Sequence, residues 1–353
     1  MRRPRSLAIF AFLVAATAAP ASAQSTARPL PAISLKSPAW SLSTGFVKTK
    51  ANPARAGLIE ASAPAGLAAS ESDAWKPTST TGAEDFSSLE VFAQAKSAAN
   101  FMDTAGSLEA QRAGFDALIG RRTEGKSAWA LHLANESSFY SFGQSSTLVP
   151  SEARPFNDLF QTSAGVQLAT NASDKLTWLA GLEVTMAGED LVDPTDSLLI
   201  GGLGGMRYSI NEDVDFSFGL AGESRLEDDA WVMPFFGMDW QIGESTRFEV
   251  QGSEMRFEQR LTDSLALNLG AVYDIRQYRL NDANPVPSGV FRDEEIRVTA
   301  GIDWQFSDSG ALGLELGKVM WNEYTVLNSS GGLVGQTEAE NTAFIGFSLR
   351  FGM

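Results

Sequence analysis

The chain has 353 residues, with 43 acidic side chains against 27 basic ones, a formal net charge of −16 and no cysteine. This acidic balance disfavours binding to nucleic acid and attachment to anionic lipid through basic patches. The absence of cysteine excludes disulfide bonds and thiolate metal sites, so the fold cannot depend on either.

The N-terminus has the pattern of an export signal. Three arginines lie within the first five residues, an apolar core follows over 7–17, and Ala-Ser-Ala precedes Gln24. The alternative is a membrane anchor, but the core is shorter than the roughly 20 residues that a spanning helix needs. We therefore predict a cleaved signal peptide over 1–23.

Residues 24–85 are rich in alanine, proline, serine and threonine, and no hydrophobic period persists through them. Such a composition predicts a flexible periplasmic extension. The alternative is a folded plug, in which Trp40, Phe46 and Trp75 would be the docking side chains.

From residue 86 to the end, apolar residues recur at every second position, as in the segment 176–186. A strand sends successive side chains to opposite faces, so this period predicts β-strands with one apolar and one polar face. The predicted strands are 86–97, 107–119, 127–137, 158–170, 175–187, 197–210, 213–224, 230–242, 246–251, 254–261, 264–279, 294–306, 311–323 and 341–352.

The links between these strands alternate in length. Short polar links rich in Asn, Asp, Ser and Gly favour turns, and the longer links are 138–157, 188–196, 280–293 and 324–340. This alternation is typical of outer-membrane barrels, which have tight periplasmic turns and longer outer loops. A turn at 251–254 gives 14 strands, whereas a bulge there, or a false early strand, gives about 12. An even number places both chain ends in the periplasm.

Charged residues gather on the face opposite the apolar one. An Arg or Lys at mid-strand on a lipid face would cost about 2–4 kcal/mol, whereas a water-lined or ion-paired interior tolerates it. The candidate lumen-facing residues are Glu183, Arg207, Asp215, Asp239, Arg256, Glu258, Asp274, Arg276, Arg297 and Asp303. Trp178, Tyr208, Trp240, Trp304 and Phe306 lie near strand ends, where aromatic girdles belong.

These patterns predict an all-β fold, an antiparallel up-and-down transmembrane β-barrel of about 12–14 strands in the outer membrane. The alternative is a soluble sandwich or barrel, in which the apolar face would point inward. The final strand supports the membrane because Phe347, Leu349 and Phe351 alternate as in the terminal assembly signal of such barrels. Gly352 and Met353 depart from that signal, which ends on the aromatic residue itself.

The stretch 216–278 resembles an uncharacterised family of bacterial outer-membrane β-barrel-like proteins. The segments that carry the resemblance are MPFFGMDW (233–240), FEQRLTDSL (257–265), GAVY (270–273) and QYRL (277–280). The resemblance implies a barrel over 86–353 and a membrane location, but no reaction or ligand.

His132 is the single histidine, and the strand pattern turns it toward the interior. A barrel hydrolase acting on envelope lipid would use such a histidine as a base beside a serine, for which Ser127, Ser137 and Ser138 are near in sequence. A structural histidine is the commoner case. We therefore expect no enzyme, no cofactor and no metal.

The leading functional hypothesis is a porin-like channel for small solutes, built as a signal peptide (1–23), an extension (24–85) and a barrel (86–353). The alternatives are a closed structural or adhesive barrel and a barrel enzyme. The expected partners are outer-membrane lipid, the barrel-assembly machinery and small solutes, and not nucleic acid. The sequence leaves the solute and the oligomeric state open.

Overall fold

The computed structural model describes residues 83–123, 127–143, 148, 149, 152, 154–156, 158–190, 192–227 and 230–352. The predicted signal peptide and the predicted extension up to residue 82 lie outside these residues. Within the described residues, no helix is long and apolar enough to cross a membrane.

The described residues form one antiparallel sheet of 15 strands. The strands are β1 (Ala83–Asn100), β2 (Ser107–Thr123), β3 (Ser127–Gly143), β4 (Asp158–Asn171), β5 (Leu176–Glu189), β6 (Leu198–Asn211), β7 (Val214–Glu223), β8 (Trp231–Ile242), β9 (Thr246–Gln251), β10 (Glu254–Thr262), β11 (Leu265–Arg279), β12 (Val290–Ser307), β13 (Gly310–Leu327), β14 (Leu333–Glu338) and β15 (Thr342–Gly352).

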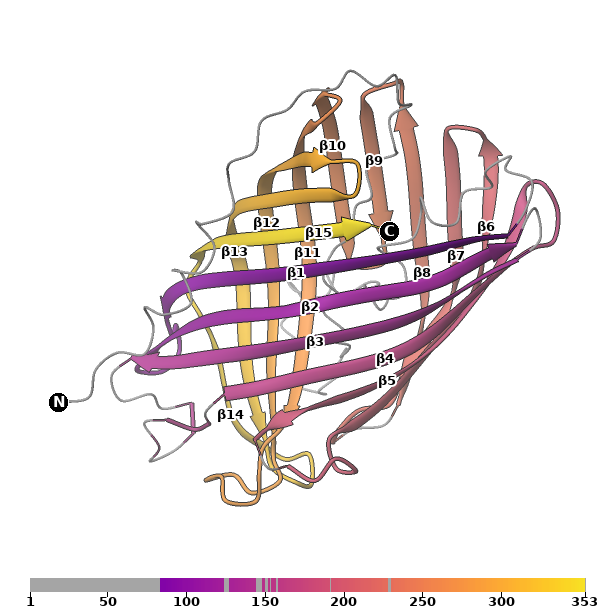
Figure 1. The fold of residues 1–353 in the computed structure, drawn as a ribbon. Helices are drawn as coiled ribbons and strands as arrows, with labels where there is room; N and C mark the ends of the chain where they lie inside the picture. The colour runs from indigo at the N-terminus through magenta and orange to yellow at the C-terminus, as the bar shows by residue number, and fades with distance from the viewer. Residues whose placement is uncertain are drawn as a thin grey trace, which may run out of the picture. The chain divides into compact units, whose positions relative to one another are not determined.

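The sheet closes on itself. Each strand from β1 to β13 pairs with the next, β15 pairs with both β13 and β1, and β14 adds only to the end of β13. Fourteen strands therefore make the closed wall, which confirms the all-β barrel and the higher of the two predicted strand counts. In Figure 1, β1–β5 lie side by side in front of β11–β13 and cross them steeply, as tilted barrel strands do.

The link at 251–254 is a turn and not a bulge. Gln251 pairs directly with Glu254, and β9 and β10 run antiparallel from there. Gly252 has a φ of 56°, a left-handed conformation that glycine adopts without the steric cost of a side chain. The prediction of a turn is confirmed, and the bulge is wrong.

Several strands run further than predicted. β3 continues to Gly143, β12 begins at Val290, and β14 lies inside the predicted link 324–340. β1 begins at Ala83, inside the predicted extension. Residues 290–293 are buried whichever way their side chains point, so the alternation that identifies a strand in the sequence is absent there.

The two ends of the wall differ. One end, here called the short-turn end, carries the short turns after β4, β6, β8, β10 and β12, the start of β1 and the end of β15. The other, the loop end, carries the longer connections, and there β11 leaves β10 and pairs through Arg279 with Gly188 of β5. Because β6–β10 end on the short-turn side of this contact, fewer strands enclose the interior at the loop end.

The outward face of the wall is apolar. Large side chains such as Leu182, Leu220, Leu269 and Leu316 are more than half exposed, whereas their neighbours along each strand point inward. The soluble alternative, with its apolar face inward, is therefore wrong for this chain. Exposed aromatic residues lie within three residues of strand ends at the short-turn end: Trp129, Trp178, Tyr208, Trp240, Trp304 and Phe351.

Gly205 and Gly219 leave space at the wall for the inward-pointing ring of Phe235. A Cβ added to Gly219 would lie 2.6 Å from Cε1 of Phe235, and one added to Gly205 would lie 2.7 Å from Cζ of the same ring. We expect Gly219→Ala to lower the free energy of unfolding by about 1–3 kcal/mol because the tightly packed ring and backbone must move. The midpoint of urea unfolding measures this loss.

Gly201 provides the matched control for that substitution. It lies on β6, next to β7, but an added Cβ would meet nothing closer than 3.7 Å. Gly201→Ala should therefore leave the unfolding midpoint nearly unchanged. Equal midpoints for the two alanine variants would show that the ring does not depend on Gly219.

Candidate functional site

The interior of the barrel is the candidate site, because the inward face carries the charged residues. Of the ten residues predicted to face the lumen, Arg207, Asp215 and Asp303 are half-buried and the other seven are buried. The structure distributes eight of them over three interior clusters at different heights. Among the described residues, Arg207 and Asp215 join none of these clusters. The lining of a conducting pore by the ten residues stays a prediction.

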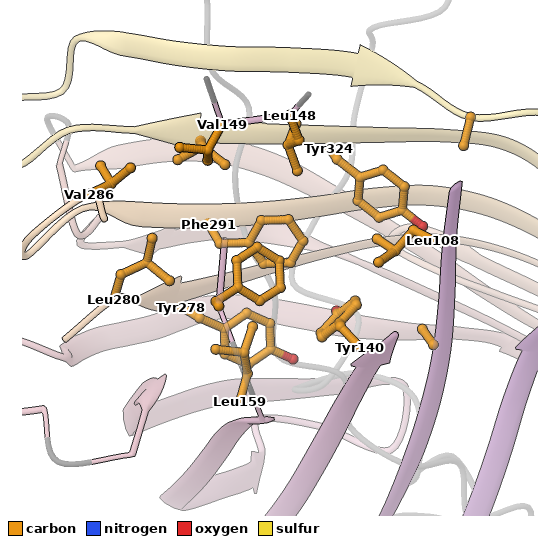
Figure 2. Close-up of a cluster of buried hydrophobic side chains, with 14 of the residues drawn as sticks. Leu108, Tyr140, Leu148, Val149, Leu159, Tyr278, Leu280, Val286, Phe291 and Tyr324 are labelled. Carbon is orange, nitrogen blue, oxygen red and sulfur yellow. The ribbon is translucent and has the colours of Figure 1, made fainter. Parts of the chain in front are cut away.

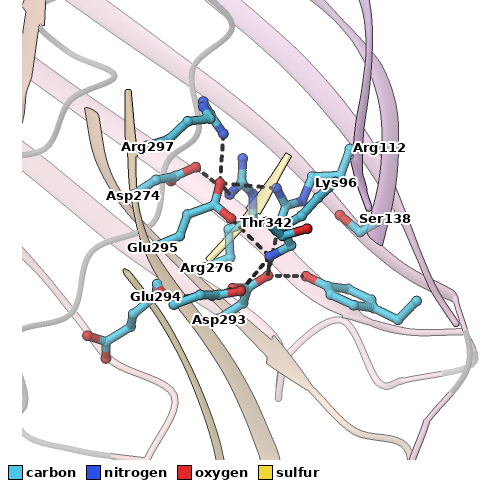
Figure 3. Close-up of polar contacts among 12 residues, drawn as sticks. Lys96, Arg112, Ser138, Asp274, Arg276, Asp293, Glu294, Glu295, Arg297 and Thr342 are labelled. Carbon is cyan, nitrogen blue, oxygen red and sulfur yellow. Dashed lines mark hydrogen bonds and ion pairs between the residues drawn. The ribbon is translucent and has the colours of Figure 1, made fainter. Parts of the chain in front are cut away.

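The first cluster, here called the ion layer, crosses the interior near the loop end. It consists of Lys96, Arg112, Asp274, Arg276, Asp293, Glu295 and Arg297 (Figure 3), together with Glu136. Glu295 of β12 lies at its centre, 3.0 Å from Nζ of Lys96 and 2.6 Å from Nη1 of Arg297. Nη2 of Arg112 donates to Oδ2 of Asp293 over 2.6 Å.

These ion pairs connect strands that are not neighbours in the wall. Nε of Arg276 on β11 lies 2.9 Å from Oε1 of Glu136 on β3. Near the loop end β11 pairs directly with β5, so only β4 and β5 separate β3 from β11 on the shorter way around the barrel. The ion pair therefore joins β3 to β11 across β4 and β5 on the inner face, where the wall is narrowed.

Directly on the loop-end side lies an apolar cluster, here called the aromatic plug. It is centred on Phe291, whose ring centroid is 4.2 Å from Phe156, 5.2 Å from Tyr140 and 6.0 Å from Tyr324 (Figure 2). Buried aliphatic side chains surround these rings: Leu108, Leu148, Val149, Leu159, Leu280, Val286 and Val326. The hydroxyl of Tyr140 donates to Asp293 over 2.9 Å and so joins the plug to the ion layer.

The second cluster lies toward the short-turn end. Asp303 accepts hydrogen bonds from Nη2 of Arg256 at 2.5 Å and from Nδ2 of Asn268 at 2.8 Å, and it forms an ion pair with Arg350. Nη2 of Arg256 also lies 3.4 Å from Glu258. Nearby on the wall, Arg247 of β9 binds Asp239 of β8 through two bonds of 2.9 Å.

The third cluster surrounds His132. Its Nε2 lies 2.5 Å from Oδ2 of Asp116 on β2, and its Nδ1 lies 3.1 Å from Oε2 of Glu183 on β5. A hydrolase of the Ser-His type needs a hydroxyl at one ring nitrogen, whereas carboxylates face both nitrogens here. Ser138 donates to Glu136 over 3.0 Å. The geometry thus gives no support to a histidine-based hydrolase.

The described residues contain no group of three or more His, Asp or Glu side chains that could hold a metal ion.

Sequence reasoning did not single out several residues of the ion layer. Lys96 and Arg112 lie on the two strands with the weakest alternation, and Asp293 fell in the predicted link 280–293. A signal was present for Arg112, because it follows Ala110 and precedes Gly114 at the inward parity of β2. Nothing in the local sequence indicated that its partner would come from β12.

The chain is structurally similar to outer-membrane β-barrel channels. An outer membrane channel from Pseudomonas putida F1 matches with a TM-score of 0.42 and 10% identity over 78% of this chain and 97% of that one. The P. putida toluene transporter TodX matches with a TM-score of 0.40 and 10% identity over 78% and 90%. The KdgM porin matches with a TM-score of 0.30 and 6% identity over 74% and 98%.

No family model matches the sequence, and no curated protein is similar to it. Solved structures at these identities and TM-scores carry no inference about function, which depends on the geometry of the interior.

Proposed function

We propose that the protein is an outer-membrane channel for small polar solutes, closed at its loop end by the aromatic plug and the ion layer. The membrane location is supported by the apolar outward face and by the aromatic residues at the short-turn end. In this arrangement the short turns face the periplasm.

One observation carries the proposal beyond a membrane location. On the short-turn side of the ion layer, Oε2 of Glu90, Oε2 of Glu223 and Oε1 of Glu249 are buried and have no hydrogen-bond partner among the described residues. An unsatisfied buried carboxylate is costly, so such a group binds a proton, water or a ligand. This half of the interior is therefore expected to be hydrated, as the interior of a channel is.

A closed barrel without a pore is the second candidate function, and the ion layer favours it. Glu136, Asp293 and Glu295 all bind basic side chains, which ties several strands of the wall together in that layer. The two candidates differ in whether the layer opens, and conductance in a planar bilayer distinguishes them. A channel gives current steps, whereas a structural barrel gives none in any folded variant.

Because the chain has no cysteine, single cysteines report which part of the interior water reaches. We expect Ser348→Cys, on the short-turn half of β15, to react with a membrane-impermeant maleimide supplied from the periplasmic side. Ser138→Cys, fully buried beside the ion layer, should stay unlabelled. Mass spectrometry of the reconstituted, folded protein measures both yields.

Ala180→Cys on the outward, lipid-facing side of β5 is the control for reagent entering through lipid. If Ser348→Cys reacts no more than Ala180→Cys, the hydrated interior is ruled out and the closed barrel is the better description.

A further inference from the structure

On the short-turn side of the ion layer, acidic residues follow one another around half of the inner wall. We name Glu90, Asp116, His132, Glu183 and Glu223 the acidic band; all five are buried. They come from β1, β2, β3, β5 and β7. Glu90 is the register partner of Asp116, and His132, Gly165, Glu183, Gly201 and Glu223 are successive register partners across β3–β7.

The two glycines in this row bring the functional side chains together. Nδ1 of His132 reaches Oε2 of Glu183 across β4 because Gly165 has no side chain between them; a Cβ there would lie 3.2 Å from that same oxygen. Gly201 leaves open space between Glu183 and Glu223, since its added Cβ would meet nothing closer than 3.7 Å. No side chain from β4 or β6 therefore stands between His132, Glu183 and Glu223 in this row.

Charge in the band is unbalanced. It holds four carboxyl groups and one imidazole; the basic residue next to it, Arg350, is the register partner of Glu90 and forms its ion pair with Asp303. Glu90 and Glu223 are each only 4% exposed, and each has a carboxyl oxygen with no hydrogen-bond partner among the described residues. Acidic groups in a low-dielectric wall raise the local concentration of cations and exclude anions.

We propose that the acidic band selects small monovalent cations, including organic ammonium compounds, as the solutes of this channel. The inference rests on the proposed channel function and names its solute class. The band does not supply the arrangement of ligands that a tightly bound metal needs among the described residues. It therefore attracts cations without retaining them, which passage requires.

The first test is the reversal potential of the reconstituted protein across a KCl gradient. We expect the wild-type protein to be cation-selective and the double variant Glu90→Gln/Glu223→Gln to lose that preference several-fold. Glu244→Gln, in an exposed turn, is the control, because it removes a carboxylate of the same kind outside the interior. Conductance without cation preference in the wild type overturns the inference but leaves the channel function standing.

The second test does not need the loop end to open. Gly201→Cys places one thiol between Glu183 and Glu223, where the open space accepts it. Cationic and anionic methanethiosulfonate reagents are supplied from the short-turn side, and the ratio of their reaction rates is measured. We expect the cationic reagent to react faster, and Glu223→Gln in the same chain to reduce the ratio.

Ser217→Cys is the matched position, because Ser217 is the register partner of Arg207 and should not favour the cationic reagent. Equal rates for the two reagents at Gly201→Cys overturn the acidic band as a selective element, whether or not the protein conducts. A charge-dependent rate in a protein that never conducts overturns the channel function instead.

Discussion

Asp293→Ala is expected to raise the conductance of the reconstituted protein and to lower its free energy of unfolding by about 3–5 kcal/mol, as removal of one partner from a buried ion pair does. The Asp293 side chain is fully buried. It accepts hydrogen bonds from Arg112 at 2.6 Å, Asn322 at 2.8 Å and Tyr140 at 2.9 Å. Without it, Arg112 and Lys96 share the carboxylate of Glu295; Lys96 keeps its hydrogen bond to Asn322, and Arg112 lies 3.9 Å from Glu136.

The consequence for the lumen follows from that excess of positive charge. Lys96 comes from β1 and Arg112 from β2, whereas Glu295 comes from β12, so the cations are expected to turn toward water in the short-turn half. The contact of β1 and β2 with β12 is then weakened at the height of the ion layer. Single-channel recording measures the open fraction, and urea unfolding followed by tryptophan fluorescence measures the stability.

Two variants separate gating from a general loss of stability. Asp263→Ala removes the same charge from an exposed turn and should change neither quantity, since isolated surface substitutions usually stay within about 0.5 kcal/mol. Asp293→Asn keeps the shape and one acceptor oxygen and should fall between wild type and alanine in both measurements. A folded Asp293→Ala barrel that conducts no more than wild type would contradict a gating role for the ion layer.

Most of the wall could be predicted from the sequence, because one face of each strand meets an apolar medium and the other a polar one. This contrast produces the period of two in the segment 176–186, and it placed Glu183 correctly opposite Leu182 and Val184. The turn at Gly252 followed from the same pattern, since the apolar parity changes there.

The loop end could not be predicted in the same way. In β12, Phe291 and Asp293 point into the interior while Val290 and Arg292 are also buried, so both faces have mixed chemistry and no alternation remains. The ion pairs between β3 and β11 depend on closure of the barrel, which joins residues about 140 positions apart in the chain. Local sequence carries no signal of such a pairing. The alternating charges predicted an open lumen, whereas the aromatic plug fills the interior at the loop end.

Phe291→Ala is expected to open the loop end by removing the central ring of the aromatic plug. Phe291 is fully buried, and its ring packs against Tyr140, Phe156, Tyr278 and Tyr324. Truncation of a buried phenylalanine typically costs about 3–5 kcal/mol because the cavity collapses only in part. Here the cavity lies in the centre of the plug, so larger current steps should accompany the loss of stability.

The matched control is Phe306→Ala, because Phe306 is 44% exposed on the outward face of β12 and its ring contacts only the outward Trp304 among the described rings. It should leave the current unchanged. Phe291→Leu refills much of the volume and should restore closure more fully than it restores stability. If Phe291→Ala loses stability but never conducts, the plug is a structural core and the closed barrel replaces the channel.

The combination of Asp293→Ala with Phe291→Ala tests whether the ion layer and the plug act as one gate. Tyr140 touches both, since its ring packs on Phe291 and its hydroxyl donates to Asp293. Substitutions that share a partner are generally non-additive by about 0.5–3 kcal/mol. We therefore expect the double variant to lose less stability than the two single losses added together, and to conduct little more than the better-conducting single variant. Strict additivity in both measurements would show two independent barriers in series.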